Sequence, residues 1–322
     1  MAAVAAGQTP ELSVTLHRDL LSEHSPAAWD RWMTQHGAAD FQHFYSYGGA
    51  MTTVNTAAYA LRFLFEAQDI ARALALRQTF GPMTLWYMPR GPHFAKTLDA
   101  EAQARQAVYQ AIVATAGLWR GTFAVFSLSA VADAPFVKNA PILTGQTEAI
   151  LQLQQEASTL HSGLRQKWRN RLHKAQKADL HVAQVKPSHA DAKWLFAAEA
   201  EQRRAKTYRA LQADLPAQLV QQPGRTKVFC FIARHQGKPV AGASFIVNSE
   251  TAFYFCGVSL AAGRALCAQH LLIFEAAVAL RAHGCRTLNL GTIDTHNFPG
   301  IARFKLGTGA HALHRAGTYL AA

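Results

Sequence analysis

One order of predicted elements occurs twice in this chain, and this repetition constrains the fold more than any other feature of the sequence. Three strand-like runs, a helix and a returning strand fill residues 58–128, and the same order recurs in residues 227–290. Helices that interrupt a mostly antiparallel run of strands are typical of an α+β fold with mixed sheets. The sequence therefore predicts two tandem β-β-β-α-β units, each a mixed sheet flanked by helices. The alternative is one irregular α/β domain in which the shared order is a coincidence.

The predicted boundaries follow from hydrophobic patterning and turn residues. The first unit has strands over 58–66, 70–78, 83–88 and 122–128 and a helix over 99–116, which Gly117 ends. The second has strands over 227–234, 239–247, 251–258 and 287–290 and a helix over 268–282, which stops near Gly284 because glycine suits a left-handed cap. We expect an N-terminal lobe at residues 1–150, to which a final strand in 310–322 can return, and a C-terminal lobe at residues 151–309.

The charge of the chain is strongly basic. It has 322 residues, with 32 Lys+Arg against 20 Asp+Glu, a net charge of +12. Such an excess favours an anionic partner, which can be nucleic acid, a phosphate-bearing small molecule or an acidic membrane surface. The alternative is that the charge serves only solubility.

The cysteines and the hydropathy point to a reducing, aqueous compartment. Cys230, Cys256, Cys267 and Cys285 form no CxxC pair, and no histidine has zinc-finger spacing. We therefore predict reduced thiols, no metal site and no disulfide. No window approaches 18 uninterrupted apolar residues, and residues 1–8 lack the pattern of a signal peptide. The sequence thus predicts a cytoplasmic protein without a membrane span.

A basic amphipathic helix is predicted over residues 158–179, between the two units. Leu160, Leu164, Trp168 and Leu172 recur every four residues and so share one face. No acidic residue separates Glu156 from Asp179, so the positive charges repel one another unless an anion binds. The alternative is a solvated basic face anchored by its apolar stripe. The candidate RNA-contacting residues are Arg165, Lys167, Arg169, Arg171, Lys174 and Lys177.

Several further positions carry groups suited to acyl transfer. Lys305 lies between an apolar pair and a glycine-rich bend, where a cation can face a cleft. Arg204 and Tyr208 are four residues apart on a predicted helix over 192–210 and so share a face. An arginine fork beside a phenol can hold a phosphate or carboxylate. Arg90 projects from a Gly-Pro bend at the end of a strand, and its alternative is an exposed arginine in an ordinary turn.

These pieces together resemble the Fem family of aminoacyltransferases, of the FemAB and FemX type. The resemblance spans roughly residues 40 to 319. It rests on the family's Pro-Arg-Gly-Pro at residues 89–92, its basic helix at 164–178, its second-lobe helix and strand at 271–290, and its Phe-Lys segment at 301–309. It implies two lobes of the GNAT acyltransferase type, aminoacyl-tRNA as donor and a peptidoglycan precursor as acceptor.

The resemblance also implies roles for individual residues. Lys305 is expected to stabilise the charge that develops on the ester carbonyl during transfer, and Phe304 to line that site. Arg204 is expected to bind a phosphate of the acceptor and Tyr208 to lie near the attacking amine. The resemblance implies no cofactor, and it implies aminoacyl-tRNA as the co-substrate.

The sequence departs from the family pattern where proton transfer is concerned. The last strand of the first lobe lacks the acidic residue that the family often has there, and Asn289 stands where the family commonly has Asp. Asp294 and His296, in the loop that follows, are candidate substitute bases. Loop histidines are mostly solvated bystanders, which is the alternative for His296. These departures make an amine other than a peptidoglycan precursor an open possibility.

The sequence and its resemblance to the Fem family therefore predict a two-lobed N-aminoacyltransferase. Two rival functions stay open. One is an acyl-CoA-dependent N-acyltransferase, although the loop at residues 259–267, with Gly263 and Arg264, matches the coenzyme A pyrophosphate pattern only in part. The other is a non-catalytic, basic RNA-binding protein that has kept the scaffold.

Overall fold

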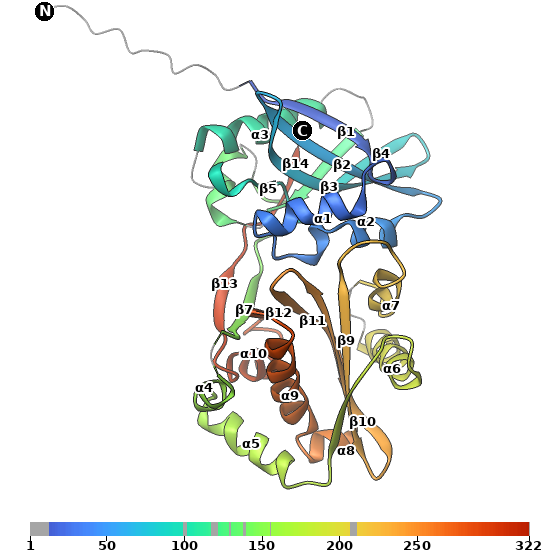
Figure 1. Cartoon of the computed structure of the whole chain (residues 1–322), viewed down its shortest axis with the longest axis vertical. Coiled ribbons are helices and arrows are strands. Elements are labelled where there is room, and N and C mark those ends of the chain that lie inside the picture. The colour runs from blue at the N-terminus through green and yellow to red at the C-terminus, as the bar shows by residue number, and fades with distance from the viewer. Residues whose placement is uncertain are drawn as a thin grey trace, which may run out of the picture. The chain divides into compact units, whose positions relative to one another are not determined.

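The chain divides into two units in a computed structural model that describes residues 13–98, 102–116, 122–128, 130–137, 140–154, 156–206 and 211–321. Unit 1 comprises residues up to His24, Met51–Thr144 and Ala316–Ala322, and unit 2 comprises Ser25–Ala50 and Gly145–Arg315. Two seven-stranded mixed sheets are present in the described part, one in each unit (Figure 1). None of the described helices is both long and apolar enough to cross a bilayer.

The sheet of unit 1 is built around a long antiparallel meander. Its strand order is β1-β2-β3-β4-β6-β14, with β5 paired to β3. The helix α3 and its neighbours pack on this sheet through an apolar core that includes Phe63, Tyr109 and Phe126. The elements are β1 Thr15–Leu20, β2 Thr56–Phe65, β3 Gln68–Phe80, β4 Met83–Met88, β5 His93–Phe94, α3 Ala102–Ala116, β6 Thr122–Ser127 and β14 Thr318–Ala321, with short 3-10 turns at Leu21–Glu23, Lys96–Leu98 and Val131–Phe136.

The sheet of unit 2 has the order β13-β7-β12-β11-β10-β9-β8. Figure 1 shows α9 and α5 on one face of this sheet and α6 and α7 on the other. The strands are β7 Thr147–Gln152, β8 His181–Val185, β9 Lys227–His235, β10 Lys238–Asn248, β11 Thr251–Ser259, β12 Thr287–Thr292 and β13 His311–His314. The helices are α4 Ala157–Ser162, α5 Gln166–Gln176, α6 Ala190–Lys206, α7 Leu215–Leu219, α8 Ala261–Ala265, α9 Ala268–Ala282 and α10 Pro299–Leu306.

The predicted β-β-β-α-β order is confirmed in both units, and α9 has the predicted bounds. The predicted basic helix differs, because Gly163 ends α4 and a new helix, α5, begins at Gln166. Trp168 and Leu172 of α5 still face the core, as the four-residue spacing predicts. Gly117, which was expected to end the helix before β6, and Tyr208 lie outside the described residues.

Residues 25–50 pack with unit 2, although they lie between two strands of unit 1 in the sequence. They form α1 Pro26–Gln35, a 3-10 turn at Phe41–His43 and most of α2 Tyr45–Met51. The fully buried carboxylate of Asp30 accepts backbone hydrogen bonds from Tyr45 (2.9 Å) and Arg225 (2.7 Å). The grouping into units thus differs from a division at residue 150, since β7 also lies in unit 2, while β14 pairs with β6 of unit 1.

The two units differ in the parallel strand pair that follows each long helix. In unit 1, β4 and β6 pair over five residues, from Thr84 with Thr122 to Met88 with Phe126. In unit 2, β11 and β12 pair only from Thr251 with Thr287 to Phe253 with Asn289. The register between β10 and β11 shifts directly after this point, and a bulge strengthens local twist and turns a strand away from its neighbour. Unit 2 therefore contains an opening between two parallel strands.

Candidate active site at the strand opening of unit 2

The ammonium group of Lys305 lies at the opening between β11 and β12. Its Nζ donates a hydrogen bond of 2.8 Å to the backbone carbonyl of Thr292, at the end of β12. The position that a Cβ of Gly291 would take is 3.6 Å from the same Nζ, so the missing side chain leaves space beside the ammonium. A lysine ammonium has three donors, and two remain for a substrate oxygen after the bond to Thr292.

Lys305 is half-buried, and its environment changes its protonation. Burial lowers the pKa of Lys305 from 10.5 to about 8, and the negative charge of Glu148 acts in the opposite direction. At pH 7 the group is still mainly protonated. A partly desolvated cation interacts more strongly with a developing negative charge than a fully hydrated cation does. The site thus holds a cation suited to stabilising an oxyanion.

The carboxylate of Glu148 is the centre of a buried polar network. Glu148 is 2 % exposed and accepts hydrogen bonds from Asn289 Nδ2 (2.9 Å) and Arg315 Nε (2.9 Å). Asn289 also accepts the backbone N–H of Gly291 through Oδ1 (2.8 Å). An aspartate at position 289 would place a carboxylate oxygen against the Glu148 carboxylate in place of the Nδ2 donor, with no proton between the two oxygens. The asparagine, which departs from the family pattern, therefore fits a buried site whose carboxylate is supplied by β7.

The two strands at the opening present unpaired edges to each other. Beyond Phe253 and Asn289 no further ladder pair joins β11 to β12 in the described ranges. Facing strand edges of this kind offer backbone donors and acceptors to an extended ligand. The Lys305 ammonium lies beside the β12 edge, through its bond to Thr292. An extended acyl or aminoacyl group bound along these edges would bring its carbonyl near a cation.

The helix α10, which carries Lys305, is fixed to the start of α5. The indole N–H of Trp168 donates to the carbonyl of Phe304 (3.1 Å), and the backbone N–H of Arg165 donates to the carbonyl of Gly307 (2.9 Å). The last carbonyls of a helix have no partner within it, so these bonds cap α10 from outside. A Cβ at Gly307 would lie 2.7 Å from Trp168 Cδ1, so only glycine permits this approach. The basic helix and the lysine helix therefore form one packed element.

His270 of α9 completes the contact between these helices. Its ring lies 4.9 Å from the Trp168 ring and 5.0 Å from the Phe304 ring, measured between centroids. It is 8 % exposed, and neither ring nitrogen makes a hydrogen bond of normal geometry with the described residues. Burial lowers the pKa of His270 to about 4, the charge of Arg171 acts in the same direction, and the backbone of Cys267 partly opposes the shift. His270 is therefore neutral at pH 7 and acts as a core aromatic.

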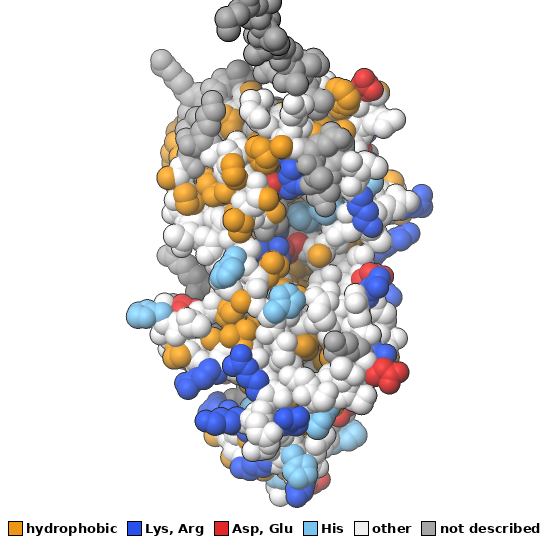
Figure 2. Space-filling view, turned by 90° about the vertical axis from the view of Figure 1, so that its left-hand side faces the viewer, with side chains coloured by type: hydrophobic (Ala, Val, Ile, Leu, Met, Phe, Trp, Pro, Cys, Tyr) orange, Lys and Arg blue, Asp and Glu red, His pale blue; other side chains and the backbone are white. Residues whose placement is uncertain are grey.

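The basic side chains of α5 point away from this cluster. Figure 2 shows Lys and Arg side chains gathered over the part of unit 2 that contains α4 and α5. No acidic residue in the described segments pairs with them, and Arg169 bonds only neutral oxygens, of Gln166 (2.9 Å) and Ser162 (3.4 Å). The exposed members of the set are Arg165, Lys167, Arg171, Lys174 and Lys177, and Arg169 is half-buried. A face of uncompensated charge of this kind favours binding of a polyanion.

The candidate bases are both in the loop between β12 and α10. Asp294 accepts hydrogen bonds from the backbone of His296 (2.9 Å) and from the backbone (2.8 Å) and side chain (2.7 Å) of Asn297. The Asn297 bonds contribute most to lowering the pKa of Asp294 below its ordinary value. A carboxylate held in this way organises the turn and is a weak base. His296 is exposed, and its role stays a prediction.

The other predicted residues are dispersed. Arg204 is exposed near the end of α6, Tyr208 is outside the described residues, and Arg90 lies in unit 1, beside Gly91 with its φ of 66°. The Phe304 ring packs toward Trp168 and His270. The structure thus brings Lys305 and Phe304 together on α10 and makes no direct contact between Lys305 and the others in its described part.

The loop predicted as a partial pyrophosphate cradle is folded on itself. Residues Ala261–Ala265 form the short helix α8, and a Cβ at Gly263 would overlap the carbonyl of Val240. Gly263 is therefore needed for packing on β10. The Arg264 guanidinium donates to the carbonyl of Ser259. This conformation differs from an open glycine-rich loop whose amides face an anion.

The residues that support Lys305 were not predictable from the sequence. Glu148 is more than 150 residues from Lys305 along the chain, and the patterns around Glu148, Thr292 and Arg315 are those of ordinary strand ends. One signal was present, because Asn289 and Gly291 interrupt the apolar run of β12. Trp168 was read correctly as a core residue, but its bond to α10 depends on tertiary contacts. The described residues contain no group of three or more side chains that could hold a metal ion.

Comparisons with known proteins support the fold of the chain. Residues 162–306 match the family described as acetyltransferase (GNAT) domain. The structure is similar to that of FemX, with a TM-score of 0.74 and 12% sequence identity over 95% of this chain and 97% of that one. A tandem GNAT protein from the clavulanic acid biosynthesis pathway gives a TM-score of 0.59 at 12% identity, covering 96% and 98%. L-PGS from Bacillus licheniformis gives 0.55 at 12%, covering 91% and 89%. No curated protein sequence matches this chain.

Proposed function

We propose that this chain, which has a Fem-type fold of two GNAT-like lobes and a GNAT domain in residues 162–306, is an N-aminoacyltransferase. In this proposal it moves an aminoacyl group from aminoacyl-tRNA to the amine of a peptidoglycan precursor or of another small acceptor. The matched domain and the tandem GNAT relative support an acyltransferase in the broader sense. The similarity to FemX and to L-PGS is compatible with an aminoacyl donor.

One observation carries the proposal. The Lys305 ammonium is held at the opening between β11 and β12 by the Thr292 carbonyl, with two donors remaining. A carbonyl oxygen placed there gains negative charge when an amine attacks its carbon, and the ammonium stabilises that charge. Removing one donor from an oxyanion site typically costs about 10²–10³-fold in kcat. The ammonium is fixed before reaction, so little reorganisation is needed.

The proposed reaction is aminolysis of the ester that links the amino acid to the tRNA. The acceptor amine attacks the ester carbonyl carbon, and a tetrahedral oxyanion forms. The ester C–O bond then breaks, the new amide bond remains, and the proton lost by the amine ends on the ribose hydroxyl of the tRNA. His296 is the proposed carrier of this proton, because Asp294 is engaged in its own turn. Arg204 is proposed to hold a phosphate or carboxylate of the acceptor, with Tyr208 near the amine.

Aminoacyl-tRNA is favoured over acyl-CoA as donor for two reasons. The basic face of α5 has no acidic partner among the described residues, and α5 is joined to the Lys305 helix through Trp168. A phosphate backbone bound on α5 would therefore lie on the element that positions the lysine. The α8 segment, by contrast, fills the loop that would otherwise hold a pyrophosphate.

The test is transfer from a charged tRNA pool to a panel of amine acceptors, with product mass as readout. We expect an amide product whose yield falls steeply with salt, since each released phosphate contact contributes about −0.7 to −0.9 to the slope of log K against log salt. The triple variant K167Q/R171Q/K174Q should weaken tRNA binding and flatten that slope. The matched control is K186Q/K193Q/K238Q, which removes the same charge from exposed lysines elsewhere in unit 2.

The rival functions give different results in the same assay. Product formation with acyl-CoA donors alone would show that acyl-CoA, and not aminoacyl-tRNA, is the donor. Salt-sensitive RNA binding without transfer from any donor would support a basic RNA-binding protein. An equal loss of tRNA affinity in both triple variants would remove α5 as the RNA-contacting face. The cytoplasmic location stays a prediction.

A further inference from the structure

The first turn of α10 exposes two large apolar side chains in unit 2. Phe298, the N-cap residue, is 55% exposed, and Ile301 is 53% exposed. A Cβ at Gly300, between them, would meet no described atom within 4 Å outside its own turn. The end of the same helix is packed against α5, whereas its start is open and apolar.

Helical spacing places both side chains on the face of Lys305. Ile301 is four residues before Lys305 and Phe298 is seven before it, and residues at these spacings share one face. Four residues span about 6 Å along a helix axis. A long helical side chain also leans toward the start of its own helix, which brings the Lys305 stem over the turn that holds Ile301. An apolar surface therefore begins beside the ammonium.

This face combines one cation with an apolar surface. Single exposed apolar side chains are common on proteins and by themselves indicate no site. Here the other charge of the helix is directed elsewhere, because Arg303 lies on the opposite side from Ile301 and its Nε donates to the Pro299 carbonyl (3.2 Å). An occupant that matches the face has one oxygen for the ammonium and an uncharged, apolar part beside it.

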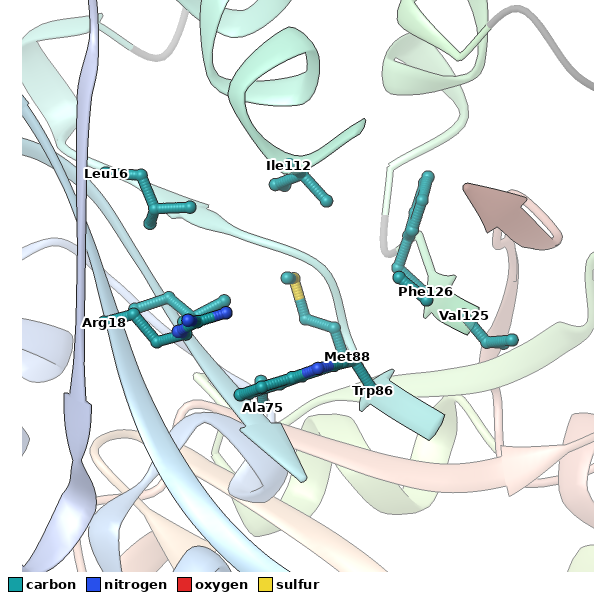
Figure 3. A pocket seen from close by; sticks show the side chains of 10 residues that line it. Leu16, Arg18, Ala75, Trp86, Met88, Ile112, Val125 and Phe126 are labelled. Carbon is teal, nitrogen blue, oxygen red and sulfur yellow. The ribbon is translucent and has the colours of Figure 1, made fainter. Parts of the chain in front are cut away.

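The apolar space in the core of unit 1 is too small for such a group. It lies between Trp86, Met88 and Ile112 (Figure 3) and measures about 40 Å³. That is room for a few water molecules at most, far below the volume of about 300–1,000 Å³ that ligand pockets have. The start of α10, by contrast, can take a side chain without any change in packing.

We propose that the face formed by Phe298, Ile301 and Lys305 selects donors whose aminoacyl group has an apolar side chain of the size of valine, leucine or isoleucine. This inference rests on the proposed function: with the ester carbonyl on the Lys305 ammonium, the side chain would lie on Ile301 and its far end near Phe298. Asp294, whose carbonyl accepts the Phe298 N–H (3.3 Å), keeps an ionised carboxylate next to this face and so disfavours an acidic side chain.

The expected selectivity is moderate, because the face is open. Complete burial of a methylene raises affinity about fourfold. A surface that covers the group on one side only should give about twofold per carbon. Leucine has three more side-chain carbons than alanine, so we expect a preference of about five- to tenfold for leucyl over alanyl donors.

The experiment measures the affinity of the full chain for one tRNA that carries different amino acids. The tRNA has an amino group in place of its terminal ribose hydroxyl, so each amino acid is held by an amide bond and is not transferred. Since the RNA is the same in every probe, differences in affinity report the aminoacyl group alone. Valyl-tRNA should bind about threefold more tightly than threonyl-tRNA, which has the same shape with a hydroxyl in place of a methyl. Aspartyl-tRNA should bind no better than alanyl-tRNA.

Three variants locate the contact. Ile301→Ala and Phe298→Ala should reduce the leucyl-to-alanyl ratio below about twofold and leave alanyl-tRNA affinity nearly unchanged. Ile301→Lys should raise the aspartyl-to-alanyl ratio about two- to fivefold, as an exposed ion pair does. The matched control is Val220→Ala, because Val220 is 44% exposed at the end of α7 in the same unit, and it should keep the wild-type ratio. Urea unfolding checks that each variant is folded.

The two proposals fail in different ways. Transfer is measured separately, with ester-linked tRNAs of the same sequence. A leucyl preference in binding without transfer from any ester would support the apolar face and contradict the proposed reaction. Transfer that is equally fast for all aminoacyl groups, with equal binding of all probes, would support the reaction and overturn this inference.

Two further results would overturn the inference. One is a leucyl preference that persists in a folded Ile301→Ala/Phe298→Ala variant, which would place the aminoacyl side chain elsewhere on the protein. The other is an equal loss of leucyl- and alanyl-tRNA affinity in that variant, which would mean that the two residues contact the RNA itself.

Discussion

The indole N–H of Trp168 donates to the carbonyl of Phe304, the residue directly before Lys305, over 3.1 Å. This bond joins the first turn of the basic helix α5 to the last turn of α10. It places the surface proposed to contact RNA and the lysine proposed to stabilise the oxyanion on one packed element. In the proposed reaction, an aminoacyl-tRNA that binds α5 would therefore be positioned relative to Lys305 without a separate contact to α10.

The first prediction concerns this bond. Trp168→Phe keeps an aromatic ring but removes the N–H donor, so the Phe304 carbonyl loses its partner and α10 loses one of the two bonds that cap it from outside. We expect a loss of about 1–2 kcal/mol in the free energy of unfolding and a fall in kcat larger than any change in KM. Urea unfolding and steady-state kinetics measure the two effects. Trp194→Phe, on α6, is the control, and equal kinetic effects of both substitutions would remove Trp168 as a positioning residue.

The second prediction concerns the stability of the lysine site. Because burial lowers the pKa of Lys305 to about 8, the unfolded chain binds more protons between pH 8 and 10.5. The free energy of unfolding of wild type should therefore rise with pH in that window. Below pH 8 the folded protein carries the full cost of burying the charged Lys305 ammonium. Lys305→Met removes the penalty and should stabilise the fold at pH 7 by about 1–3 kcal/mol, while transfer falls about 10²-fold or more. Thermal unfolding from pH 7 to 10 checks this, and a variant less stable than wild type at pH 7 would contradict it.

The third prediction is a pH profile. Transfer needs protonated Lys305, so activity should decrease through an alkaline limb near pH 8. Glu148→Gln removes the carboxylate that opposes the shift, so the limb should move to lower pH. The substitution also leaves Arg315 without its closest carboxylate, and unfolding must be measured alongside. Glu250→Gln, which changes an exposed carboxylate in the same unit, should leave the limb in place. An unchanged alkaline limb in a folded Glu148→Gln variant would show that the Glu148 charge does not affect the pKa of Lys305.

The fourth prediction concerns His270. Its pKa of about 4 lies below the ordinary value of 6.5, so the unfolded chain takes up a proton first as the pH falls. The contribution of neutral His270 to the free energy of unfolding is therefore complete above pH 6.5 and is lost as the pH falls from 6.5 to about 4. His270→Phe keeps the ring contacts with Trp168 and Phe304 and has no group to protonate. Between pH 6.5 and 4 its free energy of unfolding should therefore fall by about 2–3 kcal/mol less than that of wild type. Melting temperatures of both proteins, measured in parallel, test this. Identical pH dependence would mean that the ring is hydrated.

The repeated order of elements was predictable because strand and helix periodicity are local. The predicted helix at 268–282 coincides with α9, and the strands beside it differ by one or two residues at their ends. The four-residue spacing also identified Trp168 and Leu172 as core residues. The break at Gly163 in the predicted basic helix was not predictable in the same way. A Cβ at Gly309 would lie 2.9 Å from the Gly163 carbonyl oxygen, and the residues next to Gly163 or Gly309 in the sequence give no sign of this close approach.

The sequence by itself determined the order of the elements, the apolar faces of the helices and the position of a cation in the Phe304-Lys305 segment, because each depends on neighbours within a few residues. Only the tertiary structure decided which parallel pair opens, since the β11 bulge acts through the register with β10. It likewise decided that Glu148 lies near Lys305 and that Arg315 and Asn289 compensate the carboxylate. Burial and electrostatic interaction depend on distance in space, and segments about 150 residues apart meet only in the folded chain.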